Sequence, residues 1–295
     1  MTKLIFGCGY LGNRVARRWR EAGHDVVAVT RSRERASDFK RQGYGSIVAD
    51  VTRPETLKDL PIAETVLFAV GHDRTSGKSI EEVDAGGVRN VLDVLPEGAG
   101  RFIYISTTGV YGPAEGEWVD EATTPHPQRD GGRASWAAEQ ALAQHPLGAR
   151  SVILRLAGIY GPGRVPFINE LRAGKPIPAP ITGHLNLIHV EDAAAVVVAA
   201  SHLAPFESGP QIYCVSDGHP VERGEFYREV ARQIGAPPPR FVEPDSTSPR
   251  ALRASSDRRV RNDRMRADLQ ITLTYPDYRV GLTALLETQN QQTAG

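Results

Sequence analysis

The chain has 295 residues, a length that fits one large α/β domain or a main domain with a smaller lobe. Lysine plus arginine and aspartate plus glutamate both total 35, so there is no excess positive charge to attract nucleic acid or a membrane surface. The longest apolar stretch, residues 193–200, is far shorter than the about 20 residues that cross a bilayer. We therefore expect a globular protein with neither a nucleic-acid nor a membrane partner.

Cysteines, histidines and the N-terminus add further expectations. Cys8 and Cys214 lie far apart in the sequence and give no basis for a disulfide framework or a Cys-x-x-Cys site. None of the eight histidines pairs at metal-ligand spacing, so we expect no metal. Residues 1–3 run directly into an apolar segment, with no room for a secretory signal. We expect a cytoplasmic location.

Short apolar runs alternate with amphipathic helical stretches in the first half of the chain. The runs are residues 4–6, 26–29, 47–49, 66–70, 102–105 and 152–156. This alternation predicts the Rossmann type of α/β fold, a doubly wound parallel sheet covered by helices. Ser79 and Glu82 have the spacing of a capping box, and Gly87 in the helix that they begin indicates close packing.

Glycine and proline become frequent after residue 156, where a smaller substrate lobe is expected. One short helix is predicted there at residues 167–173. A helix at 191–204, a strand at 211–216 and a helix at 222–234 follow. The predicted organisation is a dinucleotide-binding core at 1–156, a lobe segment at 157–185, a return to the core at 186–216 and a C-terminal substrate lobe at 217–295.

A glycine-rich motif follows the first predicted strand and precedes the first helix. Gly7, Gly9 and Gly12 spell Gly-x-Gly-x-x-Gly, with Tyr10 and Leu11 between the last two glycines. The first glycine permits the tight turn, the second lets the backbone approach a pyrophosphate, and the third lets the helix pack on the strand. A structural glycine turn is the alternative. The strand before the motif and the helix after it favour a dinucleotide site formed by these five residues.

The end of the second predicted strand bears on the choice of cofactor. A site for NAD places an acidic residue there to bind the ribose 2′-hydroxyl. This chain instead has Arg31 and Ser32, followed by Arg33. Guanidinium and hydroxyl groups suit a 2′-phosphate, which a carboxylate would repel. We therefore expect Arg31 and Ser32 to bind NADP, with NAD less favoured; a solvated polar loop is the alternative.

Five further segments have a familiar pattern. They are Asp50–Val51 after the third strand, Phe68–Gly71 at the end of the fourth, Ser-Thr-Thr-Gly-Val-Tyr-Gly at 106–112, Leu-Arg-Leu-Ala-Gly-Ile-Tyr-Gly-Pro-Gly-Arg at 154–164, and Ile-His-Val-Glu-Asp at 188–192. Together they resemble the extended, nucleoside-diphosphate-sugar epimerase-like branch of the short-chain dehydrogenase/reductase superfamily, over nearly the whole chain.

The resemblance implies roles for individual residues. Asp50 and Val51 would hold the adenine, and Ala69, Val70 and Gly71 would lie beside the adenine ribose. Thr107 takes the position of the catalytic Ser or Thr. Residues implied on the substrate side are Thr108, Tyr160, Arg164, Asn186 and His189. His189 lies between two apolar residues, which also fits a structural histidine of the core.

The catalytic Tyr-x-x-x-Lys pair of the family has no counterpart here. Counting back from Glu139, the Tyr position falls on Gly131 and the Lys position on Ser135. No tyrosine in the sequence is followed by a lysine four residues later. In the helix that begins near residue 83, Asp84 also replaces an asparagine of the family pattern. These departures weaken the inference from fold to chemistry.

Two hypotheses follow. The first is an NADP-dependent oxidoreductase or epimerase-like enzyme that acts on a small polar metabolite. The second is a non-catalytic NADP(H)-binding sensor, which the missing pair favours. Seven arginines between residues 250 and 266 could meet a substrate phosphate or carboxylate, or form a solvated face. The oligomeric state stays open.

Overall fold

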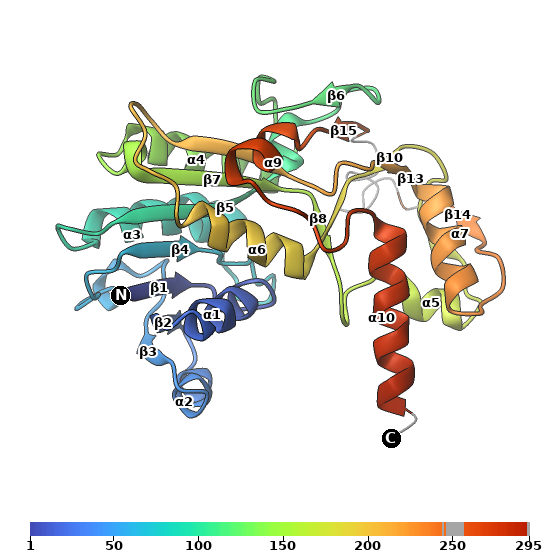
Figure 1. Cartoon of the computed structure of the whole chain (residues 1–295). Coiled ribbons are helices and arrows are strands. Elements are labelled where there is room, and N and C mark those ends of the chain that lie inside the picture. Colours follow the sequence, from blue (N-terminus) through green and yellow to red (C-terminus); the bar gives the residue numbers. More distant parts are fainter. Residues whose placement is uncertain (244, 246–256, 294–295) are drawn as a thin grey trace. The chain divides into compact units, whose positions relative to one another are not determined.

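The structure is a computed structural model that describes residues 1–243, 245 and 257–293. Figure 1 shows the helices and strands of the chain. The chain divides into two compact units. Unit 1 comprises Met1–Val110, Pro125–Arg155 and Ala194–Tyr213, and unit 2 comprises Tyr111–Thr124, Leu156–Ala193 and Cys214–Gly295. Unit 2 thus includes residues 111–124, 156, 186–193 and 214–216, for which the sequence predicts a place in the core.

Unit 1 is built on a parallel sheet, which confirms the predicted Rossmann fold. Among the described residues this sheet has seven strands in the order β12-β7-β5-β4-β1-β2-β3. The strands are β1 (Thr2–Phe6), β2 (Asp25–Thr30), β3 (Gly45–Val48), β4 (Thr65–Phe68), β5 (Arg101–Thr107), β7 (Ser151–Leu156) and β12 (Gln211–Val215). Leu4 of β1 lies opposite Val27 of β2 and Val66 of β4. The strand order reverses at β1, and ligands of such sheets bind at that switch point.

Alternate residues of these strands face opposite sides of the sheet, and each side is covered by helices. Leu4 and Phe6 belong to a core that also holds Ala138 and Leu142. Ile5 faces the other side, where it lies close to Gly12. The helices and helical turns of unit 1 are α1 (Gly12–Glu21), α2 (Arg33–Arg41), η1 (Pro54–Thr56), η2 (Glu82–Gly86), α3 (Gly87–Val94), α4 (Asp130–Gln144) and η4 (Gly148–Arg150).

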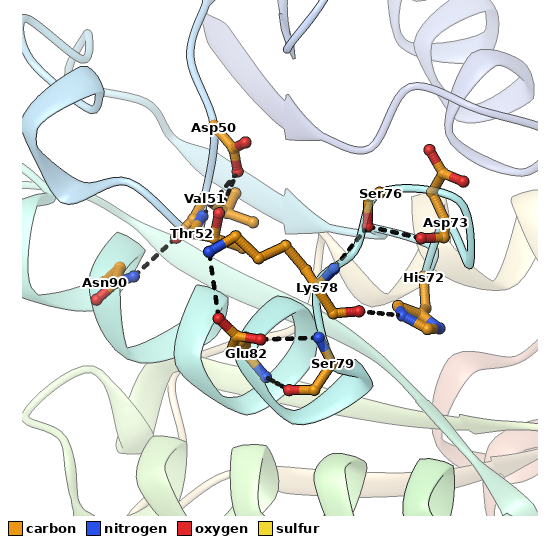
Figure 2. Close-up of polar contacts among 10 residues, drawn as sticks. All are labelled: Asp50, Val51, Thr52, His72, Asp73, Ser76, Lys78, Ser79, Glu82 and Asn90. Atoms are coloured by element: carbon orange, nitrogen blue, oxygen red, sulfur yellow. Dashed lines mark hydrogen bonds and ion pairs between the residues drawn. The ribbon is translucent and has the colours of Figure 1, made fainter.

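The helix after β4 begins with the predicted capping box. The backbone N–H of Ser79 donates to Glu82 Oε2 at 2.8 Å, and that of Glu82 donates to Ser79 Oγ at 3.1 Å, as Figure 2 shows. The first turns, η2, are a π-helix, and α3 continues from Gly87. A Cβ atom at Gly87 would lie 2.9 Å from Val51 Cγ2, so only glycine lets this helix approach so closely. The predicted close packing is confirmed.

Unit 2 has its own hydrophobic core, formed by residues that include Tyr160, Leu171, Phe226 and Tyr278. Its short strands are β6 (Trp118–Val119), β8 (Gly158–Tyr160), β9 (Ile177–Pro178), β10 (His184–Leu185), β11 (Leu187–His189), β13 (Val221–Glu222), β14 (Phe241–Val242) and β15 (Arg259–Val260). Its helices are α5 (Ile168–Arg172), α7 (Arg223–Gln233), α9 (Asp263–Leu269) and α10 (Tyr278–Thr293). The turn η3 (Thr108–Tyr111) and helix α6 (Val190–Ala200) cross the boundary between the units. A search of the described residues finds no helix with the length and apolar character of a membrane span.

Candidate functional site

The glycine-rich loop between β1 and α1 has the geometry of a phosphate-binding turn. Gly7 has φ +88°, and a Cβ atom there would lie 2.3 Å from the carbonyl oxygen of Ala69. A Cβ atom at Gly12 would lie 2.4 Å from the carbonyl oxygen of Gly7. At Gly9, by contrast, no atom lies within 4 Å of that position. Two glycines therefore permit close packing, while the third leaves open space beside the loop.

This open space is part of a cavity of about 360 Å³ in unit 1. Seven of the residues predicted to bind the cofactor line it: Gly7, Gly9, Arg31, Val51, Ala69, Val70 and Gly71. Helix α1 begins at Gly12 after Leu11, whose side chain has no polar atom to cap the helix. The first N–H groups of such a helix and its dipole favour an anion. We call the open space beside Gly9 the cradle. The cradle and the start of helix α1 fit a dinucleotide pyrophosphate.

Two arginines and one aspartate line the same cavity. Arg31 Nη2 lies 3.2 Å from Asp73 Oδ2, and both side chains are about half exposed. Arg35 Nη2 donates to the carbonyl oxygen of Cys8 at 2.8 Å. Ser32 accepts a hydrogen bond from the backbone N–H of Arg35, so its hydroxyl caps helix α2. Arg31 and Arg35 together could hold a 2′-phosphate, which would compete with Asp73 for Arg31.

Hydrogen bonds fix the loop that carries Asp50 and Val51. Asp50 Oδ1 accepts hydrogen bonds from the backbone N–H and the hydroxyl of Thr52, both at 2.9 Å. Asn90 Nδ2 donates to the carbonyl oxygen of Val51 at 2.8 Å, and Figure 2 shows this bond tying the loop to helix α3. Val51 lines the cavity, whereas Asp50, Ser32, Tyr10, Leu11 and Gly12 are not among its lining residues.

Cys8 belongs to the loop, but its thiol is chemically inert there. Its side chain is buried, and burial raises the pKa of Cys8 to about 11. A thiol with this pKa stays protonated near neutral pH and is a poor nucleophile. We assign it no role.

A second cavity of unit 1, of about 290 Å³, shares Val70 with the first. Thr107 lines it at the end of β5, where its Oγ1 accepts a hydrogen bond from the backbone N–H of Gly109 at 3.0 Å. His72, Arg129 and Asp84 also line it. The two cavities follow the carboxyl ends of neighbouring strands, where ligands of doubly wound sheets bind.

The positions that we align with the missing Tyr and Lys border this second cavity. Gly131 has no side chain, and a Cβ atom there would lie 3.3 Å from Ile80 Cδ1. Ser135 Oγ donates to Asp84 Oδ2 at 2.8 Å. One turn further along α4, Glu139 forms a buried ion pair with Arg155, 2.6 Å between Oε2 and Nη2.

The substrate residues predicted from the resemblance lie mostly in unit 2. Tyr160 is fully buried, and its ring contacts the ring of His189, which is 2% exposed. Asn186 Nδ2 donates to the carbonyl oxygen of Arg258, and Asn186 Oδ1 accepts from the backbone N–H of Val260. These contacts pack the two rings together and tie the Asn186 side chain to the backbone of residues 258 and 260. A role of the three residues in substrate binding stays a prediction.

Arg164 and Thr108 complete that set. Arg164 lines a cavity of about 190 Å³ in unit 2, together with residues that include Ile168, Leu282 and Gln233. Thr108 belongs to unit 1 and is 6% exposed, at the start of η3. The residues that line the cavity at Arg164 all belong to unit 2.

The arginine cluster between residues 250 and 266 is partly internal. Arg258 is 7% exposed and donates to the carbonyl oxygen of Gly112 at 2.8 Å. Arg259 and Arg261 both lie over the ring of Trp118, at 5.1 Å from its centroid. Arg250 and Arg253 lie outside the described residues. Arg261, Arg264 and Arg266 are exposed, so the described part of the cluster combines packed side chains with a solvated face.

The sequence predictions gave no site role to several polar residues of the two cavities, among them Arg35, Asp73 and Asp84. Arg35 follows Arg31 by four residues, a spacing that a helix start can bring to one side. The sequence marks Asp84 as unusual, because an aspartate stands there in place of an asparagine of the family pattern. Asp73 reaches Arg31 across 42 residues of sequence, and no local pattern indicates that contact. Among the described residues no group of three or more His, Cys, Asp or Glu side chains could hold a metal ion.

Comparisons with known proteins agree with this architecture. The model of the NAD-dependent epimerase/dehydratase family matches residues 4–215. Protein YeeZ of Escherichia coli K12 is 31% identical, over 92% of this chain and 96% of its own. The 2-alkyl-3-oxoalkanoate reductase of Stenotrophomonas maltophilia is 27% identical, over 78% of this chain and 74% of its own. The solved structure of a putative NAD-dependent epimerase/dehydratase from Methylobacillus flagellatus is 33% identical, with a TM-score of 0.78 and 98% of each chain covered. The chain therefore belongs to the NAD-dependent epimerase/dehydratase family.

Proposed function

We propose that the chain is an NADP-dependent oxidoreductase that acts on a small polar metabolite. The observation that carries the proposal is the pair of cavities that share Val70 in unit 1. The first cavity offers an open cradle at Gly9, and the second contains Thr107. An extended dinucleotide would place its pyrophosphate at the cradle and its nicotinamide toward Thr107. The bound cofactor would supply or accept a hydride there.

The preference for NADP rests on charge. Two guanidinium groups, those of Arg31 and Arg35, line the adenosine end of the first cavity. Hydrogen bonds from Thr75, and then from Arg31, hold the pKa of Asp73 below its usual range, so this carboxylate is ionised and attracts Arg31. A 2′-phosphate carries more negative charge than one carboxylate and accepts bidentate bonds from arginine. It would displace Asp73 from Arg31.

The substrate class is proposed from chemistry and relatives together. The second cavity contains hydroxyl, carboxyl, imidazole and guanidinium groups, a set suited to an oxygen-bearing metabolite. One relative of the chain is named as a reductase of 2-alkyl-3-oxoalkanoates, which carry a ketone beside a carboxylate. A ketone or aldehyde on a small polar molecule is therefore the first substrate class to test.

The cofactor preference has a direct test. Arg31→Ala should weaken NADPH binding by about 1.5 to 3 kcal/mol and leave NADH binding nearly unchanged, since only NADPH has the phosphate that the guanidinium would contact. Isothermal titration calorimetry with both cofactors measures the difference. Arg33→Ala is the matched control, because Arg33 is exposed in the same segment but does not line the cavity. Equal losses for both cofactors, or a wild-type preference for NADH, would reject NADP.

A sensor without catalysis is the second candidate, favoured by Gly131 and Ser135 at the positions aligned with Tyr and Lys. The assay is NADPH oxidation against panels of ketones, aldehydes and sugar nucleotides. Thr107→Ala should lower any turnover at least about tenfold, because its hydroxyl would orient the reacting oxygen. Turnover that survives loss of Thr107 would show that the active site lies elsewhere. Tight NADPH binding with no turnover on any panel would favour the sensor.

A further inference from the structure

A partly buried carboxyl group borders the second cavity at the point where the family's proton-transferring tyrosine is missing. Asp84 lies on the π-helical turn η2. The hydroxyl of Tyr104 donates to its Oδ1 at 2.6 Å, and Ser135 Oγ donates to its Oδ2 at 2.8 Å. Tyr104 comes from β5 and Ser135 from α4, so two separate elements hold the carboxyl in place.

Among the described residues, no arginine, lysine or histidine forms an ion pair with the Asp84 carboxyl group. On α4, Glu139 is neutralised by its buried ion pair with Arg155, and it accepts a hydrogen bond from Ser106 Oγ at 2.5 Å. Within the part of the chain that the structure describes, the hydrogen bonds of the Asp84 carboxyl group come only from hydroxyl groups.

Other titratable groups near this carboxyl lie on three further segments. His72 and Arg129 line the same cavity, and Tyr104 is fully buried behind the carboxyl. On its own helix, Glu82 is bound to Ser79 and Lys78. Asp84 is thus the acidic group that the cavity itself contains.

We propose that Asp84 is the acid–base residue of the second cavity and exchanges a proton with an oxygen atom of the ligand bound there. The proposal rests on the proposed function, since it takes that ligand to be the nicotinamide end of the cofactor with its substrate. In the acid direction the carboxyl O–H bond breaks, a new O–H bond forms on the ligand oxygen, and the carboxylate keeps the electron pair. Water restores the proton.

The surroundings are suited to that task. Burial raises the pKa of Asp84, with the neighbouring Glu139 as a smaller contribution, while hydrogen bonds from Tyr104 and Ser135 oppose the rise. A carboxyl group whose pKa is raised toward neutrality holds its proton over a larger part of the working pH range. The rigid hydroxyl donors then stabilise the carboxylate once the proton has left.

The test uses the charge difference between the two cofactor forms and needs no substrate. The nicotinamide ring of NADP⁺ is positively charged and that of NADPH is not, so a nearby carboxyl should lose its proton when NADP⁺ binds. We expect NADP⁺ binding to release up to about half a proton more than NADPH binding, at a pH above the range in which an exposed aspartate titrates. Isothermal titration calorimetry of the full chain in two buffers of different ionisation enthalpy measures the number of protons.

Three variants test whether the released proton comes from Asp84. Asp84→Asn should remove the difference between the two cofactors, while Asp93→Asn, at an exposed position of the same helix, should keep it. If Asp84→Asn does not fold, Tyr104→Phe provides the alternative test of the assignment. Loss of the hydrogen bond from Tyr104 destabilises the carboxylate, so the pH of greatest release should rise. A role limited to packing would not move that pH.

Each outcome separates the two proposals. A proton release that is equal in wild type and Asp84→Asn, or that Tyr104→Phe leaves at the same pH, overturns the assignment of Asp84 and leaves the proposed function intact. Failure of the wild-type chain to bind either NADP⁺ or NADPH overturns the proposed function, and this assignment with it.

Discussion

Gly9→Val is expected to abolish the binding of NADPH and NADH while the chain keeps its fold. No atom lies within 4 Å of a Cβ at this position, and Gly9 is not among the glycines with positive φ, so the apo protein accommodates the side chain. The valine would instead occupy the cradle in which we place the pyrophosphate. Affinity should fall at least about 100-fold, or about 3 kcal/mol. The fluorescence of bound NADPH and thermal unfolding of the apo protein measure the two effects.

Gly12→Ala is the matched comparison within the same loop. Its Cβ would lie 2.4 Å from the carbonyl oxygen of Gly7, so this variant should lose both stability and cofactor binding. Retention of wild-type affinity in Gly9→Val would mean that the cofactor binds elsewhere. If Gly9→Val destabilised the protein as much as Gly12→Ala does, the position beside Gly9 would not be open space, and the proposed pyrophosphate site would be wrong.

Asp217→Asn is expected to stabilise the protein at neutral pH. Asp217 is 2% exposed in unit 2, and burial raises its pKa to about 8, helped by the negative charges of Asp277 and Asp192. Its Oδ1 accepts a hydrogen bond from the backbone N–H of His219 at 2.9 Å, and its buried Oδ2 has no hydrogen-bond partner among the described residues. Asparagine has the same shape and carries no charge, so it removes the cost of ionising a buried acid.

The direction of the pH dependence follows from the two pKa values. The unfolded chain loses the Asp217 proton near pH 4, whereas the folded chain keeps it up to about pH 8. Wild-type stability therefore falls as pH rises from about 4 to 8, and by pH 7 this one group lowers the free energy of unfolding by about 4 kcal/mol.

Urea unfolding of wild type and Asp217→Asn at several pH values measures this effect. The two proteins should be equally stable near pH 4, and the variant should be more stable near pH 7. Asp263→Asn is the control in the same unit, because the Asp263 side chain is 78% exposed. A variant less stable than wild type at pH 7 would show that Asp217 is ionised and needed as a carboxylate.

Local sequence patterns determined the fold and the family of this chain. The apolar runs at 4–6 and 66–70 became β1 and β4, because period and burial in a parallel sheet are properties of short segments. The capping box at Ser79 and the glycine turn at Gly7 formed as predicted, since their partners lie within a few residues or in the next strand. The resemblance of the longer motifs then indicated the family to which the chain belongs.

Only the tertiary structure decided which polar groups share a cavity. Asp84 meets Tyr104 across 20 residues of sequence and Ser135 across 51, and Arg31 meets Asp73 across 42. The sheet aligns the carboxyl ends of β2 and β4, which Arg31 and Asp73 follow, whereas η2 and α4 pack together beside β5 and bring Asp84, Ser135 and Tyr104 into contact. No local period encodes such contacts. The burial of Asp217 also results from the packing of distant segments. The desolvation that raises its pKa depends on every segment packed around it. The packing of distant segments therefore set the contacts and the charge of these residues.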